Sequence, residues 1–300
     1  MKNITNVYEA VGSNKLKSNL VMLFFIAFVV GLVWIYSQAF GYGPEMIGYA
    51  LVFSGVTSFA SYWYSDKIIL GISGARPANR KKDFNFYTVT ENLSMAAGIP
   101  MPKLYVIEDT APNAFATGRD PKHAVVCATT GLLEKLSRTE LEGVIGHELS
   151  HIGNYDIRLM SIVTVLAGLI VLISDWMFRT SRVSRNDDNR AQGPLMLIAF
   201  VLLLLSPIVA SLIKLAISRR REFLADASSA KLTRFPEGLA RALEKIAKDK
   251  EPLEAANKAT AHLYIVNPLK NHHDAVGWFA GLFNTHPPVQ ERIKDLRAMV

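Results

Sequence analysis

An uncharged apolar run near the start of the sequence limits what this chain can fold into. Residues 20–36 read LVMLFFIAFVVGLVWIY, and residues 37–40 extend the segment without adding a charge. A helix that crosses a bilayer needs about 20 apolar residues, so the sequence predicts a membrane-spanning helix here. The run is too long for the apolar part of a cleaved signal peptide. Half of the 300 residues are hydrophobic, which also favours a membrane protein over a soluble domain.

A second apolar segment, residues 46–65, is predicted to return across the membrane. The loop between the two segments carries Glu45 and neither lysine nor arginine. Basic residues gather instead outside the pair, at positions Lys2, Lys15, Lys17, Lys67, Arg76, Arg80, Lys81 and Lys82. Because basic residues stay on the cytoplasmic side, we expect both flanks to be cytoplasmic. This predicts a membrane hairpin over residues 1–65 and the first part of a cytoplasmic domain over residues 66–158.

Two further apolar segments, residues 159–174 and 194–217, predict a second hydrophobic hairpin within residues 159–218. The connection between them, RTSRVSRNDDNRAQG, carries four arginines and is a poor loop to place outside the cell. Two helices that dip into the membrane or pack on the soluble domain therefore stay an alternative. Either arrangement returns residues 219–300, the second part of the cytoplasmic domain, to the starting side.

The remaining segments predict a mostly α fold with a small β-sheet, an α+β class. Helical spacing covers residues 84–97, 139–154, 222–248 and 287–300, and strand patterns cover residues 103–108 and 123–129. Thr139 with Glu142 is the expected capping box of the second helix. The single cysteine, Cys127, excludes an internal disulfide and a cysteine pair for metal. The formal charge of +7 does not predict nucleic acid binding, because the basic residues flank apolar runs.

The sequence GVIGHELSHIGNYD contains the pattern H-E-x-x-H inside a predicted helix. His147 and His151 are four residues apart, so both imidazoles lie on one helical face and can bind one Zn²⁺. Glu148 would lie beside the water that the metal activates, where it can take a proton and pass it to a leaving amine. A chance match on a polar face is the alternative. The apolar residues around the motif disfavour it, since burying these side chains without a ligand is costly.

A catalytic zinc has three protein ligands and one open position, so a further His, Asp or Glu is required. Glu222 and Asp226, in the segment SRRREFLAD, are also four residues apart. On a helix the first could bind zinc while the second hydrogen-bonds a ligand histidine. The spacing alone does not decide this, because charged pairs four residues apart usually form a solvated face.

Three segments, HELSHIGNYD, SRRREFLAD and THPPVQERI, together resemble the HtpX family of membrane metallopeptidases, relatives of the CAAX prenyl proteases. NAFATG at residues 113–118 and the hydrophobic pairs follow the family's order, so the resemblance covers nearly the whole chain. It implies that His147, His151 and Glu222 bind one zinc ion per subunit. Glu148 would be the general base and acid, and Asp226 would support a ligand.

The resemblance also implies a zincin-like metallopeptidase domain in a multi-pass protein of the cell membrane. With the charge distribution, the catalytic domain is expected to face the cytoplasm. The expected activity is cleavage of peptide bonds in misfolded or membrane proteins, as quality control under stress. The expected partners are protein or peptide substrates and the lipid bilayer, without nucleic acid.

Several other residues are candidates for binding substrate, lipid or metal or for assisting catalysis, and each has two interpretations. Asn113 could hydrogen-bond substrate backbone or form a turn after Pro112. The strand at residues 123–129 could be an exposed edge that pairs with substrate, or a plain structural strand. His286 could stabilise a developing oxyanion or pack before a proline, and Arg221 could do the same or bind lipid head groups. The pair His272 and His273 is expected to be a solvated loop rather than a second metal site.

Three competing functions are weighed against a metalloendopeptidase. A protease for prenylated C-termini is disfavoured because that group generally carries more membrane spans. An inactive scaffold or chaperone with a metal site is disfavoured because Glu148 is present and such a protein would be free to lose it. A transporter is disfavoured because the apolar segments contain hardly any charge, chiefly Lys214.

Overall fold

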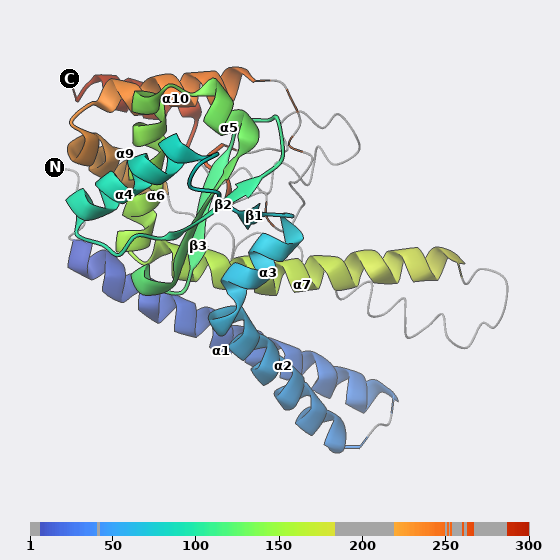
Figure 1. The fold of residues 1–300 in the computed structure, drawn as a ribbon. Helices are drawn as coiled ribbons and strands as arrows, with labels where there is room; N and C mark the ends of the chain where they lie inside the picture. Colours follow the sequence, from blue (N-terminus) through green and yellow to red (C-terminus); the bar gives the residue numbers. More distant parts are fainter. Residues whose placement is uncertain are drawn as a thin grey trace.

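A small mixed sheet lies between two layers of helices, and a helical hairpin projects away from them (Figure 1). The computed structural model describes residues 7–40, 43–183, 219–249, 251, 253, 260, 263–266 and 287–299. Within them the helices are α1 (Val7–Phe40), α2 (Glu45–Trp63), α3 (Ser65–Ile72), α4 (Phe84–Ala97), α5 (Thr130–Lys135), α6 (Arg138–Gly153), α7 (Asp156–Val183), α9 (Arg219–Thr233), α10 (Pro236–Lys248) and α12 (Val289–Arg297). The strands are β1 (Arg76–Pro77), β2 (Lys103–Ile107), β3 (Ala114–Gly118) and β4 (Ala124–Thr129). The prediction of a mostly α fold with a small sheet is confirmed.

The sheet has the strand order β1-β2-β4-β3. β4 pairs in parallel with β2 and antiparallel with β3, so this segment is not an exposed edge. Of its two interpretations, the structural strand is confirmed and the exposed edge was wrong. β3 forms the edge instead, and the sequence did not predict it as a strand, because AFATG is poor in the β-branched and aromatic residues that strands favour.

Side chains alternate along each strand, and helices cover both faces of the sheet, so both faces are buried. Val126 and Ala128 face one apolar core, which also contains residues of α4, α6 and α10. Val125 and Cys127 face a second core built with residues of α1, α3 and α7. The sheet thus joins the helix with the H-E-x-x-H motif to the helices of the N-terminal segment.

The N-cap of helix α6 lies two residues earlier than the sequence predicted. Ser137 is the N-cap, and its hydroxyl accepts from the Glu140 backbone while the Glu140 carboxylate accepts from the Ser137 N–H at 2.7 Å. The expected pair of Thr139 and Glu142 was therefore wrong. Lys245 of α10 donates to the same Glu140 oxygen at 2.7 Å, a tertiary contact that the capping pattern could not reveal.

The chain turns sharply between α6 and α7, with an angle of 84° between α6 and the first part of α7. Tyr155 in this turn has φ of 59°, a left-handed conformation that is uncommon for a residue with a side chain. Its ring is covered by the cations of Lys15, at 4.4 Å, and Arg158, at 5.2 Å. The bend places the start of α7 back beside the end of α6.

Two glycines let α6 approach its neighbours closely. A Cβ at Gly143 would lie 2.6 Å from the Leu239 backbone nitrogen of α10, and one at Gly146 would lie 2.8 Å from the Ser229 hydroxyl of α9. That hydroxyl donates to the Gly143 carbonyl at 2.7 Å. Any larger side chain would push these helices apart, so the glycines set how closely α9 and α10 approach α6.

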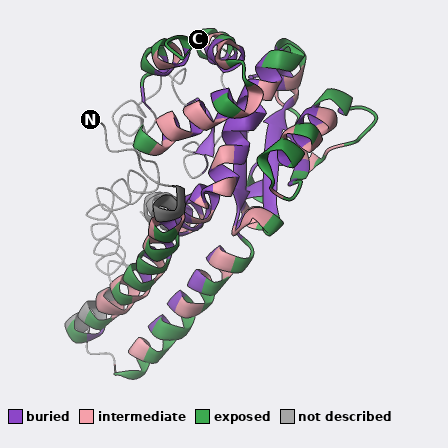
Figure 2. Cartoon of the chain, turned by 90° about the vertical axis from the view of Figure 1, so that its left-hand side faces the viewer, coloured by how far each residue is buried: buried purple, intermediate pink, exposed green. Residues whose placement is uncertain are grey.

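The helices α1 and α2 form the projecting hairpin, much of which is exposed (Figure 2), and many of its exposed side chains are large and apolar. In α2 the buried residues are Ala50 and the serines Ser54, Ser58 and Ser61, whereas large side chains such as Val52 and Phe59 are more than half exposed. This is the reverse of a helix in a soluble protein. Small and hydroxylated residues at a helix contact, with apolar side chains outside, are typical of helices packed in lipid.

Of the described helices, one segment, Val11–Gly31, is long and apolar enough to cross a membrane, or two if α6 and α7 count as one bent span. The predicted first span lies in α1, and the second segment forms α2. The third segment lies in α7, where Leu159, Ile162 and Leu166 are buried against the sheet. That part packs on the soluble domain, as the alternative interpretation expected. The fourth segment, residues 194–217, lies outside the described residues.

Candidate metal centre

Two histidines of α6 face one another inside the protein. His147 and His151 lie one helical turn apart, and their Nε2 atoms are 3.1 Å apart. The ring planes stand at 89°, and both side chains are buried. Two nitrogens bound to one tetrahedral zinc ion would lie about 3.3 Å apart, from bond lengths of roughly 2.05 Å. The separation therefore matches that of two ligands on one ion.

Glu222 of α9 completes this group from a distant part of the sequence. Its Oε1 lies 3.4 Å from His151 Nε2, and its Oε2 lies 3.8 Å from His147 Nε2. One ligand atom from each of the three residues lies within 4.8 Å of the others, and all three residues are buried. The structure thus brings together the three ligands that the sequence predicted.

A carboxylate lies behind each imidazole. Asp226 contacts His147 Nδ1 at 2.9 Å, and Asp156 contacts His151 Nδ1 at 3.0 Å. Each carboxylate favours the tautomer with hydrogen on Nδ1, which leaves the Nε2 lone pair free for a metal. In that tautomer the two Nε2 lone pairs and the Glu222 carboxylate face one another, and a cation would satisfy all three. Asp226 was predicted in this role, whereas Asp156 was missed although HIGNYD includes it.

Arg292 of α12 is fully buried beside these carboxylates and was also missed. It donates to both oxygens of Asp226, at 2.8 and 2.6 Å, and its Nη1 lies 3.7 Å from Glu222. Nη1 also donates to the Ile265 carbonyl at 3.2 Å. A two-bond contact of this kind holds the carboxylate in one orientation. The only sequence signal was its place in THPPVQERI, where an arginine in a polar helix looks like a surface residue.

Arg221 and Asn14 orient the second carboxylate. Arg221 Nη1 lies 3.2 Å from Asp156 Oδ1 and donates to the Asn14 side-chain oxygen at 2.8 Å. The Asn14 amide donates to Asp156 at 2.7 Å and to the Asn154 carbonyl at 3.0 Å. Arg221 was expected to stabilise an oxyanion or bind lipid. These contacts instead make Arg221 a residue that orients the Asp156 carboxylate. The side chains of residues 221 and 222 leave α9 in different directions, so Arg221 does not share the position of Glu222.

The charges of this cluster favour a divalent cation. Four carboxylates, those of Glu148, Glu222, Asp156 and Asp226, face the two guanidinium groups of Arg221 and Arg292. The group therefore carries an excess of two negative charges in its ionised form. A divalent ion between the Nε2 atoms would neutralise that excess, so the donor set and the charge both fit a metal such as zinc.

The two histidines differ in their affinity for protons. Burial lowers the pKa of His147 to about 4, helped by the positive charge of Arg292 and only partly opposed by Asp226. Burial also acts on His151, but the Asp156 hydrogen bond and the charges of Glu222 and Glu148 outweigh it and raise the pKa to about 9. The Arg292 guanidinium overcomes burial at Asp226 and lowers the pKa of that carboxyl to about 2. The carboxylates around His151 therefore stabilise a positive charge at its ring.

Asn113 has a structural partner rather than an open position. It is buried, and its amide donates to the Val266 carbonyl at 2.9 Å while its oxygen accepts from the Ala114 N–H. These bonds tie the start of β3 to the segment that contacts Arg292. Neither a simple turn nor an exposed substrate contact describes this arrangement. His286, His272 and His273 lie outside the described residues.

Comparisons with known proteins show which proteins this chain is similar to. The model of peptidase family M48 matches residues 81–300. A protease HtpX homolog of Dictyoglomus turgidum is 46% identical over 97% of this chain and 94% of its own length. The homolog of Caldanaerobacter subterraneus subsp. tengcongensis is 43% identical over 98% of both chains. The solved structure of S. mikatae Ste24p is 20% identical, with a TM-score of 0.48, over 95% of this chain and 66% of that one.

The family match includes the segments that supply His147, Glu148, His151 and Glu222, and the HtpX homologs match almost the entire length. The chain therefore belongs to peptidase family M48, among the HtpX homologs.

Proposed function

We propose that this chain is a membrane-bound zinc metalloendopeptidase that hydrolyses peptide bonds in misfolded or membrane proteins. The observation that carries the proposal is the buried group of His147, His151 and Glu222, whose donor atoms lie within 4.8 Å of one another. Glu148 follows the first ligand on the same helix. A bound zinc ion would supply Lewis-acid polarisation of the scissile carbonyl and of a water molecule.

The protein side chains have separate tasks in this mechanism. His147, His151 and Glu222 hold the metal, and Asp226 and Asp156 keep the imidazoles in the tautomer that can bind it. Glu148 takes a proton from the attacking water and delivers it to the leaving amine. The site is buried, so a carboxylate in this position acts without competition from bulk water.

An extended substrate would add to β3, because β4 is paired on both sides. The bond from the Thr129 N–H to the Asn113 carbonyl shows that Asn113 faces β4, so Ala114 and Ala116 present their backbone groups to the outer edge. The Ala114 carbonyl already accepts from the Ile265 N–H at 3.0 Å. We therefore expect the backbone around Ala116 to pair with substrate.

We place α1 and α2 in the membrane as the hairpin of residues 1–65, with the catalytic parts 66–158 and 219–300 in the cytoplasm and a second hydrophobic hairpin over 159–218. The exposed apolar surface of the N-terminal pair supports this assignment. Single-cysteine labelling tests it: Glu45→Cys should react with an impermeant thiol reagent in intact cells, and Lys82→Cys only after lysis. Cys127 is buried and its thiol pKa is raised by that burial, so it stays unreactive. The opposite labelling pattern would reverse the orientation.

Cleavage of casein by purified, zinc-reloaded protein tests the chemistry. Glu148→Gln should lower the rate by about 10²–10⁴-fold while zinc stays bound at one per subunit. Glu142→Gln, which changes a surface carboxylate on the same helix that pairs with Arg138, is the matched control and should cleave normally. Equal activity of wild type and Glu148→Gln would refute the mechanism. If Glu222→Gln kept full zinc content and activity, the third zinc ligand would have to be another residue.

The inactive scaffold and the prenyl-protein protease remain the competing assignments. A scaffold would bind zinc without cleaving casein in the same assay. A prenyl-specific enzyme would cleave a prenylated peptide and leave casein and its unprenylated counterpart intact. The Glu148 carboxylate contributes to the raised pKa of His151, which indicates that it lies close to the metal group as a hydrolase requires.

A further inference from the structure

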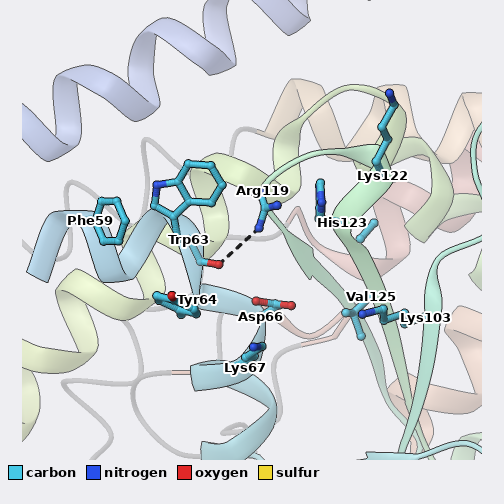
Figure 3. A pocket seen from close by; sticks show the side chains of 11 residues that line it. Phe59, Trp63, Tyr64, Asp66, Lys67, Lys103, Arg119, Lys122, His123 and Val125 are labelled. Carbon is cyan, nitrogen blue, oxygen red and sulfur yellow. Dashed lines mark hydrogen bonds between the residues drawn. The ribbon is translucent and has the colours of Figure 1, made fainter.

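A pocket of about 450 Å³ lies where α2 enters the globular domain (Figure 3). It is lined by the end of α2, the start of α3, strands β2 and β4 and the turn that follows β3. No residue of the metal centre lines it. The pocket is therefore a separate feature that peptide hydrolysis does not use.

The charged side chains of this pocket favour an anionic ligand. Lys67, Lys103, Arg119 and Lys122 line it, from three different parts of the fold, and one carboxylate, that of Asp66, lines it with them. Four cations around one cavity repel each other unless an anion neutralises them. A phosphate group, with several acceptor oxygens, matches such a set of donors.

The remaining wall is aromatic and apolar. Phe59 and Trp63 of α2 line the pocket and are 57% and 43% exposed. The Arg119 guanidinium stacks 4.6 Å from the Trp63 ring centre and donates to the Trp63 carbonyl at 3.4 Å, as the dashed line in Figure 3 marks. Asp120 lies 3.5 Å from Arg119 Nε outside the lining and already contacts His123 at 2.8 Å. The contacts with Trp63 thus hold Arg119 at the boundary between the cationic and the apolar side of the pocket.

The position of the pocket favours a phospholipid over a free phosphate ion as the source of the anion. It lies at the end of the exposed apolar hairpin, and the aromatic residues Trp63 and Tyr64 mark this end, as they do at membrane interfaces. A free phosphate ion would use the cations alone. A phospholipid would use both walls, with its phosphate among the lysines and its acyl chains along the exposed side of α2.

We propose that this pocket binds the head group of an anionic phospholipid such as phosphatidylglycerol. The inference rests on the proposed placement of α1 and α2 in the membrane, and it is independent of the proposed peptidase activity. A bound lipid would link α2, α3 and the β3–β4 turn, and so fix the orientation of the hairpin relative to the sheet.

The test uses the full chain with Glu148→Gln, so that proteolysis cannot interfere, in nanodiscs of equal phosphatidylglycerol and phosphatidylcholine with identical acyl chains. Native mass spectrometry counts the lipids that stay bound. The variant Lys67→Gln, Lys103→Gln, Lys122→Gln removes three cations of the pocket. Its matched control, Lys231→Gln, Lys248→Gln, Lys294→Gln, removes three exposed cations from α9, α10 and α12. A parallel sample contains excess inorganic phosphate.

The unaltered pocket should retain phosphatidylglycerol over phosphatidylcholine, and the control should do the same. The pocket variant should lose that preference by about fivefold or more, since one basic side chain near an anionic surface is worth roughly that factor. No preference in the unaltered pocket, or an equal loss in the control, overturns the proposal. Displacement of the lipid by inorganic phosphate would assign the site to a free anion and overturn it too. Failure of the chain to enter nanodiscs would instead refute the membrane placement.

Discussion

The side-chain amide of Asn14 in α1 donates a 2.7 Å hydrogen bond to the carboxylate of Asp156, whose other oxygen contacts the candidate ligand His151. A helix expected to be a membrane anchor therefore takes part in the hydrogen bonds that orient the metal centre. Asn14 is almost fully buried and also accepts from Arg221. The N-terminal hairpin and the catalytic site are consequently one structural unit.

Removing this amide should weaken metal binding without touching a ligand. Asn14→Ala leaves Asp156 with Arg221 alone, so the His151 ring is less firmly held, and we expect zinc affinity to fall by about 10–100-fold. Competition with a chelator of known affinity measures this. Ser18→Ala is the control, because the Ser18 hydroxyl donates to the Asn14 backbone carbonyl within the same helix. Unchanged affinity in Asn14→Ala would mean that α1 does not support the site.

The buried contact between Arg292 and Asp226 should be essential for stability. Arg292→Met leaves the Asp226 carboxylate buried beside His147 without its guanidinium, and we expect a loss of about 3–5 kcal/mol in the free energy of unfolding. Arg292→Lys should recover only part of it, since an amine cannot make both bonds. Denaturant unfolding in detergent measures the difference. Arg297→Met removes an exposed arginine from the same helix and should change little. If both variants behaved alike, the Arg292 contact would be dispensable.

A methyl group at Gly143 should push α10 away from α6, the helix that carries two of the candidate ligands. Its Cβ would meet the Leu239 backbone at 2.6 Å, so α10 must move, at a cost of about 1–3 kcal/mol. We expect Gly143→Ala to lower both the unfolding temperature and zinc affinity. Gly153→Ala, at the end of the same helix with open space around it, is the control. Equal stability of wild type and Gly143→Ala would show that this contact relaxes easily.

The cap of α6 should make stability depend on pH. Burial acts to raise the pKa of Glu140, but the Lys245 bond and the Ser137 backbone bond outweigh it and lower the pKa in the folded protein. The carboxylate therefore stabilises the fold above its unfolded pKa, and this contribution disappears as the pH falls through the folded value. Glu140→Gln should cost about 1 kcal/mol at neutral pH and progressively less in acid.

Unfolding measurements from about pH 7 to about pH 4 test this, with Glu142→Gln as the control that lacks the capping role. A difference between wild type and Glu140→Gln that stays constant with pH would contradict the assignment.

Local patterns identified much of the fold. Gly98 ends α4 with φ of 66°, as the sequence predicted, and both predicted strands occur within a residue of their expected limits. The helix predicted over 222–248 is interrupted at Arg234, which has φ of 54° and separates α9 from α10. The cap of α6 was misplaced because Ser137 and Thr139 are both good N-caps with an acid three residues later, and only the contact from Lys245 favours the first.

The sequence by itself determined the ligand pair, because four residues on a helix put His147 and His151 on one face whatever surrounds them. It also identified Glu222 and Asp226, through a motif shared with a family. Only the tertiary structure decided that Asp156, Arg221, Arg292 and Asn14 complete the site, since they converge from α7, α9, α12 and α1. The physical reason is that a buried charge needs a partner in space, and local periodicity carries no information on which distant segment provides it.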